Sequence, residues 1–212
     1  MKQFYDFKVE KIKNLSPEDK NLREENLDLF YKNGFPNKKE EDWKFSDLNS
    51  ILSKNFDNIT NKDFLLDSKK LNLINEFDHN HIFLIDGKLI SSDLTHEDKN
   101  KISIIDFNYK NNVTINKNNS LNLLNNALAM GGFTLEVSKN YKFNKPLVIY
   151  NYFSKDIKKA IINNKNSIIL NDNSELTLIN YIDNKSKDNF MVNSMENIEI
   201  RRDALLKNIF IN

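Results

Sequence analysis

The chain has 212 residues, of which 39% are hydrophobic and 29% are charged, and its mean hydropathy is −0.61. Its 31 basic and 30 acidic residues leave a net charge of +1, which argues against a nucleic-acid-binding or membrane-surface protein, because such proteins carry a basic excess. With no cysteine, the chain can form no disulfide or thiol nucleophile and cannot by itself hold a cysteine-ligated zinc ion or iron–sulfur cluster.

The N-terminal segment is polar and contains no apolar core of signal-peptide length. No apolar run in the chain approaches the ~20 residues that span a bilayer. We therefore expect a cytoplasmic protein that contacts no membrane. A weak helix is predicted at the start of this segment, because Phe4, Phe7 and Lys11 fall on one helical face.

A well-marked helix is predicted over residues 17–33. Ser16 can cap it, Pro17 suits its first position, and Gly34 followed by Pro36 ends it. Its apolar face consists of Leu22, Leu27, Leu29 and Phe30. A shorter helix is predicted to open at Ser46, with an apolar side made of Leu48, Ile51, Leu52 and Phe56.

The stretch between the two helices, GFPNKKEEDWKFSDL, contains the single tryptophan of the chain, Trp43. Large aromatic side chains are usually buried, so Trp43 and Phe45 are predicted to turn inward while the charged residues face water. On this interpretation Trp43→Ala lowers the free energy of unfolding by ~3 kcal/mol or more. An unchanged melting temperature would indicate an exposed docking residue instead.

Strand patterns dominate after residue 78. Residues 82–90 predict a hairpin, with Asp86 and Gly87 in a type I′ turn. A helix is predicted at about 120–130, capped by Ser120 and ended by the Gly131–Gly132 pair. Further strands are predicted at 102–106, 113–115, 133–137, 147–152, 167–170, 175–182, 196–200 and 206–211.

The spacing of these strands shows no strict repeat, so it leaves a β-sandwich and an irregular β-helix open. Asparagine in the turns favours the β-helix, because stacked coils use it at left-handed corners. The whole pattern predicts an α+β protein, with an N-terminal helical domain over residues 1–77 and a β domain over 78–212.

The residues that usually carry catalysis or bind metal form no recognisable constellation. His79 and His81 lack the further ligands of a zinc site, and His96 has no obvious partner. Residues 40–42 are adjacent acids on a charged loop, where nothing suggests burial. Phosphate-binding, nucleophile-elbow and zinc-protease motifs do not occur. We therefore expect a protein that is not an enzyme and has no catalytic, cofactor-binding or metal-binding residues.

Two stretches resemble the SufB/SufD family of iron–sulfur cluster assembly proteins. The first comprises Gly34-Phe35-Pro36, then Glu41-Asp42-Trp43-Lys44-Phe45-Ser46, then Leu48. The second runs from Asn125 through Gly132 to Val137 and continues with Asn144-Lys145-Pro146-Leu147. Residues 173–181 are similar to the next coil of the family, with Asn180 where an acid is usual. The residues Gly34, Pro36, Asp42, Trp43, Lys44, Phe45, Gly132 and Pro146 carry the resemblance and are expected to be structural.

The resemblance implies an N-terminal helical domain followed by a right-handed parallel β-helix. It also implies a scaffold that pairs with SufB-like and SufC-like proteins, SufC being an ATPase, and whose assembled complex carries an iron–sulfur cluster. The form and position of the tryptophan motif are closer to SufD than to SufB. Family members are about twice as long, so the resemblance covers an N-terminal half, and the cluster-linked and SufC-binding regions lie beyond it.

Two interpretations from other classes stay open on the residues alone. A β-helix enzyme acting on polysaccharide would need clustered Asp or Arg side chains on one coil face, and no such cluster is visible in the sequence. A generic interaction module is the remaining alternative. Capture of an ATPase partner, as opposed to binding of a glycan, would discriminate the scaffold from the enzyme.

Overall fold

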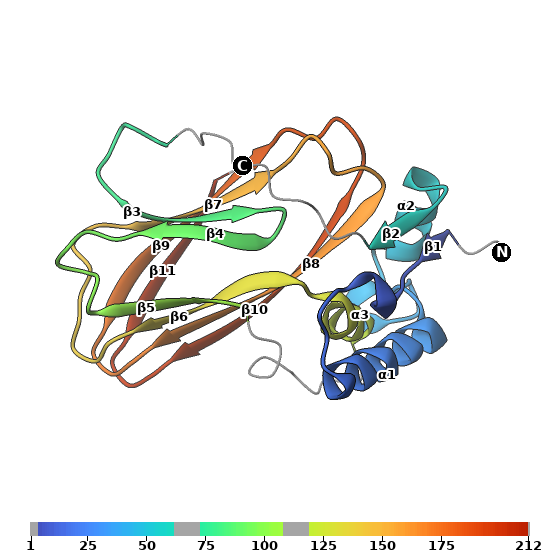
Figure 1. Cartoon of the computed structure of the whole chain (residues 1–212), viewed down its shortest axis with the longest axis horizontal. Helices are drawn as coiled ribbons and strands as arrows, with labels where there is room; N and C mark the ends of the chain where they lie inside the picture. Colours follow the sequence, from blue (N-terminus) through green and yellow to red (C-terminus); the bar gives the residue numbers. More distant parts are fainter. Residues whose placement is uncertain (1–3, 62–72, 108–118, 212) are drawn as a thin grey trace.

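The computed structural model describes residues 4–61, 73–107 and 119–211. Over these residues the protein is mixed α and β, with three α-helices and two mostly parallel sheets (Figure 1). The helices are α1 (Pro17–Asn33), α2 (Leu48–Asn55) and α3 (Ser120–Leu128), and short 3-10 turns lie at Val9–Lys11 and Glu41–Trp43. The strands are β1 (Tyr5–Asp6), β2 (Ile59–Asn61), β3 (Asn80–Ile85), β4 (Lys88–Asp93), β5 (Ile102–Asp106), β6 (Gly131–Val137), β7 (Leu147–Phe153), β8 (Ala160–Leu170), β9 (Glu175–Asn184), β10 (Met191–Ile200) and β11 (Leu205–Ile211).

From β6 onward the chain alternates between the two sheets. Strand β8 pairs in parallel with β6 and β10 in the first sheet, whose remaining strands are β1, β2 and β5. Strand β9 pairs in parallel with β7 and β11 in the second sheet, which β3 and β4 complete. Aligned partners lie 33, 31, 30 and 30 residues apart in the pairs Gly131–Asn164, Leu147–Leu178, Ile161–Met191 and Glu175–Leu205. Each turn of the chain through both sheets therefore takes 30–33 residues.

A hydrophobic core fills the space between the two sheets. Alternate residues of each strand point into it, as the two-residue period of strands requires. Strand β8, for example, contributes Ile168 and Leu170, which lie opposite Leu135 and Val137 of β6. The other buried members are Ile82, Leu84, Ile102, Phe133, Leu147, Ile149, Leu176 and Leu178. Burial of this apolar surface stabilises the stacked strands.

A second core joins the helices to the outer face of the first sheet. Helices α1 and α3 pack against each other, and Figure 1 shows both at one end of the sheets. This core includes Leu27 and Phe30 of α1, Leu124 and Leu128 of α3, and Ile161 of β8. This core contains residues from both sides of residue 77, and β2 also pairs with β8.

Residues 4–8 are not helical, contrary to the sequence prediction, and Val9–Lys11 forms a 3-10 turn. Phe4 and Phe7 flank the short strand β1 and pack into the second core around Phe30 and Phe35. The rings of Phe30 and Phe35 lie 5.1 Å apart in an edge-to-face arrangement. Extended backbone at this point lets β1 pair with β2, which the sequence did not predict.

The helix over residues 17–33 is confirmed, and Ser16 Oγ accepts a 3.1 Å hydrogen bond from the Asp19 amide. The caps of the other two helices differ from the prediction. Asp47, not Ser46, caps α2, and Asn119, not Ser120, caps α3, because each carries the acceptor oxygen that reaches the free amides. Helix α3 ends at Leu128, and the paired glycines open β6 instead of ending the helix.

The predicted hairpin is confirmed as β3 and β4, and Asp86 and Gly87 both have positive φ, as a type I′ turn requires. The other predicted strands are also present, although β8 and β10 begin several residues earlier than predicted. The strand predicted at residues 113–115 lies outside the described residues.

A polar cluster ties the segment after β4 to the second sheet. The carboxylate of Asp98 accepts hydrogen bonds from the side chains of Asn80 (2.7 Å), Thr95 (2.5 Å) and Tyr141. Burial pushes the pKa of Asp98 upward, but these three hydrogen bonds and the nearby Lys145 charge lower it, so that it lies below its ordinary value. The bond to Asp98 raises the pKa of Tyr141 to about 12.

Candidate functional site

The loop between α1 and α2 is anchored at its N-terminal end. Gly34 ends α1 with φ +73°, and its amide donates a 2.6 Å hydrogen bond to the Phe30 carbonyl. Pro36 is buried, and its carbonyl accepts a 3.3 Å hydrogen bond from the Asn49 amide. Phe35 is only 2% exposed and belongs to the second core. Gly34, Phe35 and Pro36 therefore have structural roles.

The middle of the same loop faces solvent. Phe45 is 90% exposed, and the Lys44 ammonium lies 5.3 Å from the centre of its ring. Lys44 also pairs with Glu41 at 2.8 Å, while Asp42 is exposed. Trp43 is half-buried and outside the cluster of core residues. The prediction that both aromatic residues turn inward is therefore wrong for Phe45, and Trp43 is not among the core residues, whereas Phe35 is.

The second stretch of interest crosses from α3 into β6. Gly132 has φ +124°, and a Cβ atom there would lie 2.5 Å from the Lys165 carbonyl carbon and closer still to its oxygen. Its neighbour Gly131 packs in the same way against the backbone of Gly87, in the β3–β4 turn. Pro146 begins the approach to β7, and its carbonyl accepts a 3.0 Å hydrogen bond from the Asn80 amide. Gly132 therefore lets the backbone of β6 approach β8 closely, and Pro146 links the start of β7 to β3.

Buried polar side chains link α3 and α1 to the first sheet. Asn125 donates to the carbonyl oxygens of Asn164 (3.1 Å) and Asn193 (2.6 Å). Arg23 donates to the Ala127 carbonyl at 2.9 Å, and Lys165 donates to the side chain of Asn126. Burial, and then the nearby Arg23 charge, lower the pKa of Lys165 to about 8. Sequence reasoning missed Arg23 and Lys165, because charged residues at such positions usually face water.

The histidine pair lies at the start of β3. The His79 ring bonds through Nε2 to the Tyr150 hydroxyl (2.8 Å) and through Nδ1 to the Phe77 carbonyl (3.0 Å). His81 is half-buried, and burial lowers its pKa. His96 is exposed on the loop after β4. The structure brings His79 and His81 together, with ring centres 6.1 Å apart, and leaves His96 out.

Comparison with known families decides where this fold belongs. Residues 1–149 match the family described as "SufBD protein N-terminal region". This range contains the loop between α1 and α2, Gly132 and Pro146. The chain belongs to the SufB/SufD family. Among curated proteins, none matches the chain.

Membership of the SufB/SufD family connects the chain to iron–sulfur cluster assembly by the SUF system. Within residues 4–61, 73–107 and 119–211, no group of three or more His, Cys, Asp or Glu side chains is arranged to hold a metal ion. Over the same ranges, no helix is long and apolar enough to cross a membrane.

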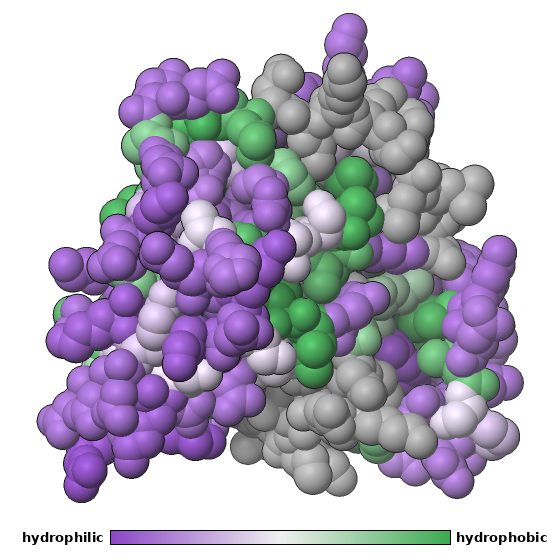
Figure 2. All heavy atoms as spheres, turned by 60° about the vertical axis from the view of Figure 1, so that its left-hand side comes forward, coloured by the Kyte–Doolittle hydropathy of each residue, from purple (hydrophilic) through white to green (hydrophobic). Residues whose placement is uncertain are grey.

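Strands β10 and β11, the last of each sheet in chain order, lie at sheet edges. Among the described strands, β10 pairs only with β8, and β11 pairs only with β9. Large hydrophobic side chains are exposed on both: Val192, Ile198, Ile200, Leu205, Ile209, Phe210 and Ile211. Figure 2 shows hydrophobic residues exposed at several places among hydrophilic ones on the face that it draws. Edge strands with apolar side chains are suited to strand pairing.

Proposed function

We propose that this chain is a SufD-like, non-catalytic component of the scaffold on which the SUF system assembles iron–sulfur clusters. The match of residues 1–149 to the SufB/SufD N-terminal region carries the proposal. The SufD assignment rests on the tryptophan motif in the loop between α1 and α2. The cluster is the product of the assembled complex and not a cofactor resident in this chain.

The proposed partners are a SufB-like protein and a SufC-like ATPase. In this proposal the alternation of β6 to β11 between two sheets is the beginning of a right-handed parallel β-helix. The parallel pairing of β6, β8 and β10 and of β7, β9 and β11 supports this, because stacked coils pair their strands in parallel.

Asp98, Asp86 and His79 each have hydrogen-bond partners within the fold, which supports a scaffold over an enzyme. Asp98 accepts three side-chain hydrogen bonds within one cluster. Asp86 accepts bonds from the amide (2.8 Å) and hydroxyl (2.7 Å) of Ser154, which fixes the β3–β4 turn. His79 is held between Tyr150 and Phe77. These groups orient the backbone and present no acid–base pair to a substrate.

Depletion of the protein in its own cells tests this function. The proposal predicts that an enzyme with a labile iron–sulfur cluster loses activity and that chemical reconstitution of its cluster restores it. The amount of that enzyme protein should stay unchanged. Full activity in depleted cells, or a loss that reconstitution fails to restore, would contradict a role in cluster assembly.

A further inference from the structure

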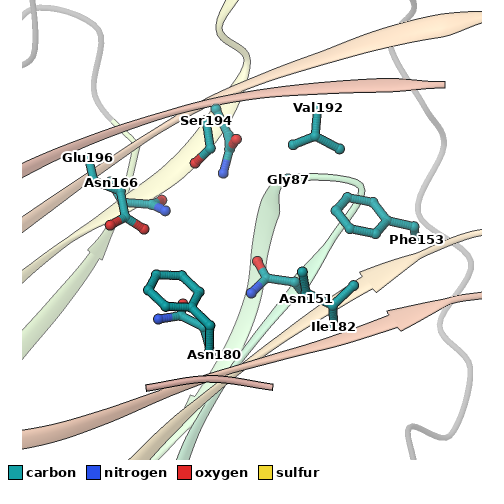
Figure 3. Close-up of a pocket in the computed structure, with 11 residues that line it drawn as sticks. Gly87, Asn151, Phe153, Asn166, Asn180, Ile182, Val192, Ser194 and Glu196 are labelled. Atoms are coloured by element: carbon teal, nitrogen blue, oxygen red, sulfur yellow. The ribbon is translucent and has the colours of Figure 1, made fainter. Parts of the chain in front are cut away.

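A hollow between the two sheets is open on one side. Figure 3 shows Asn166 and Glu196 at one end of it and Phe153 at the other. Its lining also includes Val192 of β10 and Phe210 of β11, which are 39% and 61% exposed. The hollow therefore opens at the edge formed by these two strands and does not enclose a ligand.

Another hollow, of about 350 Å³, lies on the outer face of the second sheet, beside the start of β3. Successive residues of a strand point to opposite faces. Ile82 and Leu84 point into the core between the sheets, so His81 and Phe83 point outward. His79, one residue before β3, lines the hollow together with His81, and both are half-buried. A ligand from solvent can therefore reach both imidazole rings.

The hydrogen bonds of His79 determine which of its ring nitrogens can bind a metal ion. Nδ1 lies 3.0 Å from the Phe77 carbonyl oxygen, which can only accept, so Nδ1 carries the proton of the neutral ring. Nε2 then offers a lone pair, which accepts a hydrogen bond from the Tyr150 hydroxyl at 2.8 Å. Metal-binding histidines have this arrangement, in which one nitrogen donates to a carbonyl and the other binds the metal. His79 is therefore oriented as a ligand.

Tyr150 is held in place independently of its bond to His79. Its hydroxyl also accepts a 2.9 Å hydrogen bond from the Ile74 amide, and its side chain is buried beside Phe83. When a metal ion binds Nε2, the hydroxyl can donate to a water molecule on the metal instead. Because a neutral hydrogen bond contributes little net free energy, this exchange opposes metal binding only weakly.

His81 supplies a second nitrogen. The centres of the two imidazole rings are 6.1 Å apart. Two imidazoles that bind one ion at about 2 Å have their centres roughly 5 Å apart, so side-chain rotation of about 1 Å brings them together. Asp93 lies opposite His81 in the pairing of β3 with β4 and adds negative charge on this side. Asp78 also lines the hollow and pairs with Lys145 at 2.5 Å.

Two protein ligands determine the kind of metal ion. A structural zinc site takes four protein ligands, which this hollow does not provide. Cu²⁺ binds nitrogen ligands most strongly among the divalent first-row ions, and water can fill its other positions. We propose that His79 and His81 form an open surface site for an imidazole-preferring divalent transition-metal ion, with Cu²⁺ bound most tightly. This site is independent of the proposed role in cluster assembly.

Pulsed electron paramagnetic resonance of the native protein with one equivalent of Cu²⁺ tests the site, because it counts the imidazoles on the metal. We expect two imidazoles on one bound ion. A signal from a single imidazole, or from none, would overturn the proposal. An excess of Mg²⁺ should not displace the Cu²⁺, since Mg²⁺ prefers oxygen ligands. Displacement by Mg²⁺ would show that carboxylates and not imidazoles bind the ion.

Variants of the three histidines locate the binding by titration calorimetry with Cu²⁺. His79→Gln and His81→Gln should each weaken the affinity by about tenfold or more, because each removes one of two ligands. His96→Gln is the matched control, since His96 is exposed on the loop after β4 and outside the lining of the hollow. Its affinity should be unchanged. Equal losses in all three variants, or no loss at His79 or His81, would overturn the proposal, and melting curves verify that the variants are folded.

Discussion

Gly132 of β6 lies directly against the backbone carbonyl of Lys165 in β8, in a conformation with φ +124° that L residues rarely adopt. Both the close approach and the positive φ require a residue without a Cβ atom. The contact occurs where the chain leaves α3 and enters the parallel strands. It therefore links the helical layer to the register of the first sheet.

Gly132→Ala should consequently lower the free energy of unfolding by about 3 kcal/mol or more, because strain and backbone overlap add. Chemical denaturation with circular dichroism measures this. Gly34→Ala is the control, since Gly34 also has positive φ but its nearest added contact is Tyr5 Oη at 3.9 Å. It should cost only about 1–2 kcal/mol. Equal losses would show that backbone strain alone, and not the contact with Lys165, makes Gly132 necessary.

The aromatic residues of the loop after α1 should differ sharply in their contribution to stability. Phe35→Ala should lower the free energy of unfolding by about 3–5 kcal/mol, because Phe35 is buried against Phe30. Phe45→Ser should change it by no more than about 0.5 kcal/mol, because Phe45 is exposed. Trp43→Ala should lower it by about 1 kcal/mol, well below the value expected from sequence. Thermal melts of the three variants decide this, and a loss at Phe45 as large as at Phe35 would refute the placement of the loop.

Much of the β architecture was predictable because local chemistry dictates it. Asp86 and Gly87 specify a turn with two positive φ angles, and the alternating apolar residues of β6 and β9 mark their buried faces. The repeat of 30–33 residues was not recognisable. Aligned residues of β3 and β7, such as Asn80 and Leu147, are 67 positions apart, since other elements intervene between them.

The errors arose where tertiary packing overrides residue type. Phe45 is a large aromatic residue but is exposed, whereas Phe35 of the same loop is buried in the second core. Lys165 is charged, yet it is buried because α3 covers this face of β8. Asn166 of β8 lies beside Glu196 of β10, and only the register of the two strands brings them together. No local pattern encodes these three outcomes.

The Asp98 cluster should make stability depend on pH in a defined direction. Since the folded-state pKa of Asp98 lies below its unfolded value, the ionised carboxylate stabilises the fold above about pH 4. This contribution is lost as the pH falls through the folded pKa. Asp98→Asn should therefore lower the free energy of unfolding at pH 7 by about 1–3 kcal/mol. The difference from the wild type should shrink as the pH falls below 4.

Urea denaturation at a series of pH values measures this difference. Glu97→Gln is a suitable control, because Glu97 is the exposed neighbour of Asp98. Its curve should follow that of the wild type. A pH-independent effect of Asp98→Asn would mean that the cluster does not favour the ionised carboxylate.

Asn125 should be important for holding α3 on the first sheet. Asn125→Ala removes both hydrogen bonds to the carbonyl oxygens of Asn164 and Asn193 and should cost about 2 kcal/mol. Asn122→Ala, on a half-buried position of the same helix, should cost less than about 0.5 kcal/mol. Hydrogen exchange should also show faster exchange in β10 for Asn125→Ala alone. Similar exchange in the two variants would exclude this role for Asn125.

If this SufB/SufD family member works as a scaffold, protein partners should be bound to it in the cell. Native affinity purification of the tagged protein from its own cells, with mass spectrometry of the co-purifying proteins, tests it most directly. We expect a SufC-like ATPase and a SufB-like protein in fixed proportion to the tagged chain. Recovery of the chain without either of them, or with a bound glycan in their place, would contradict it.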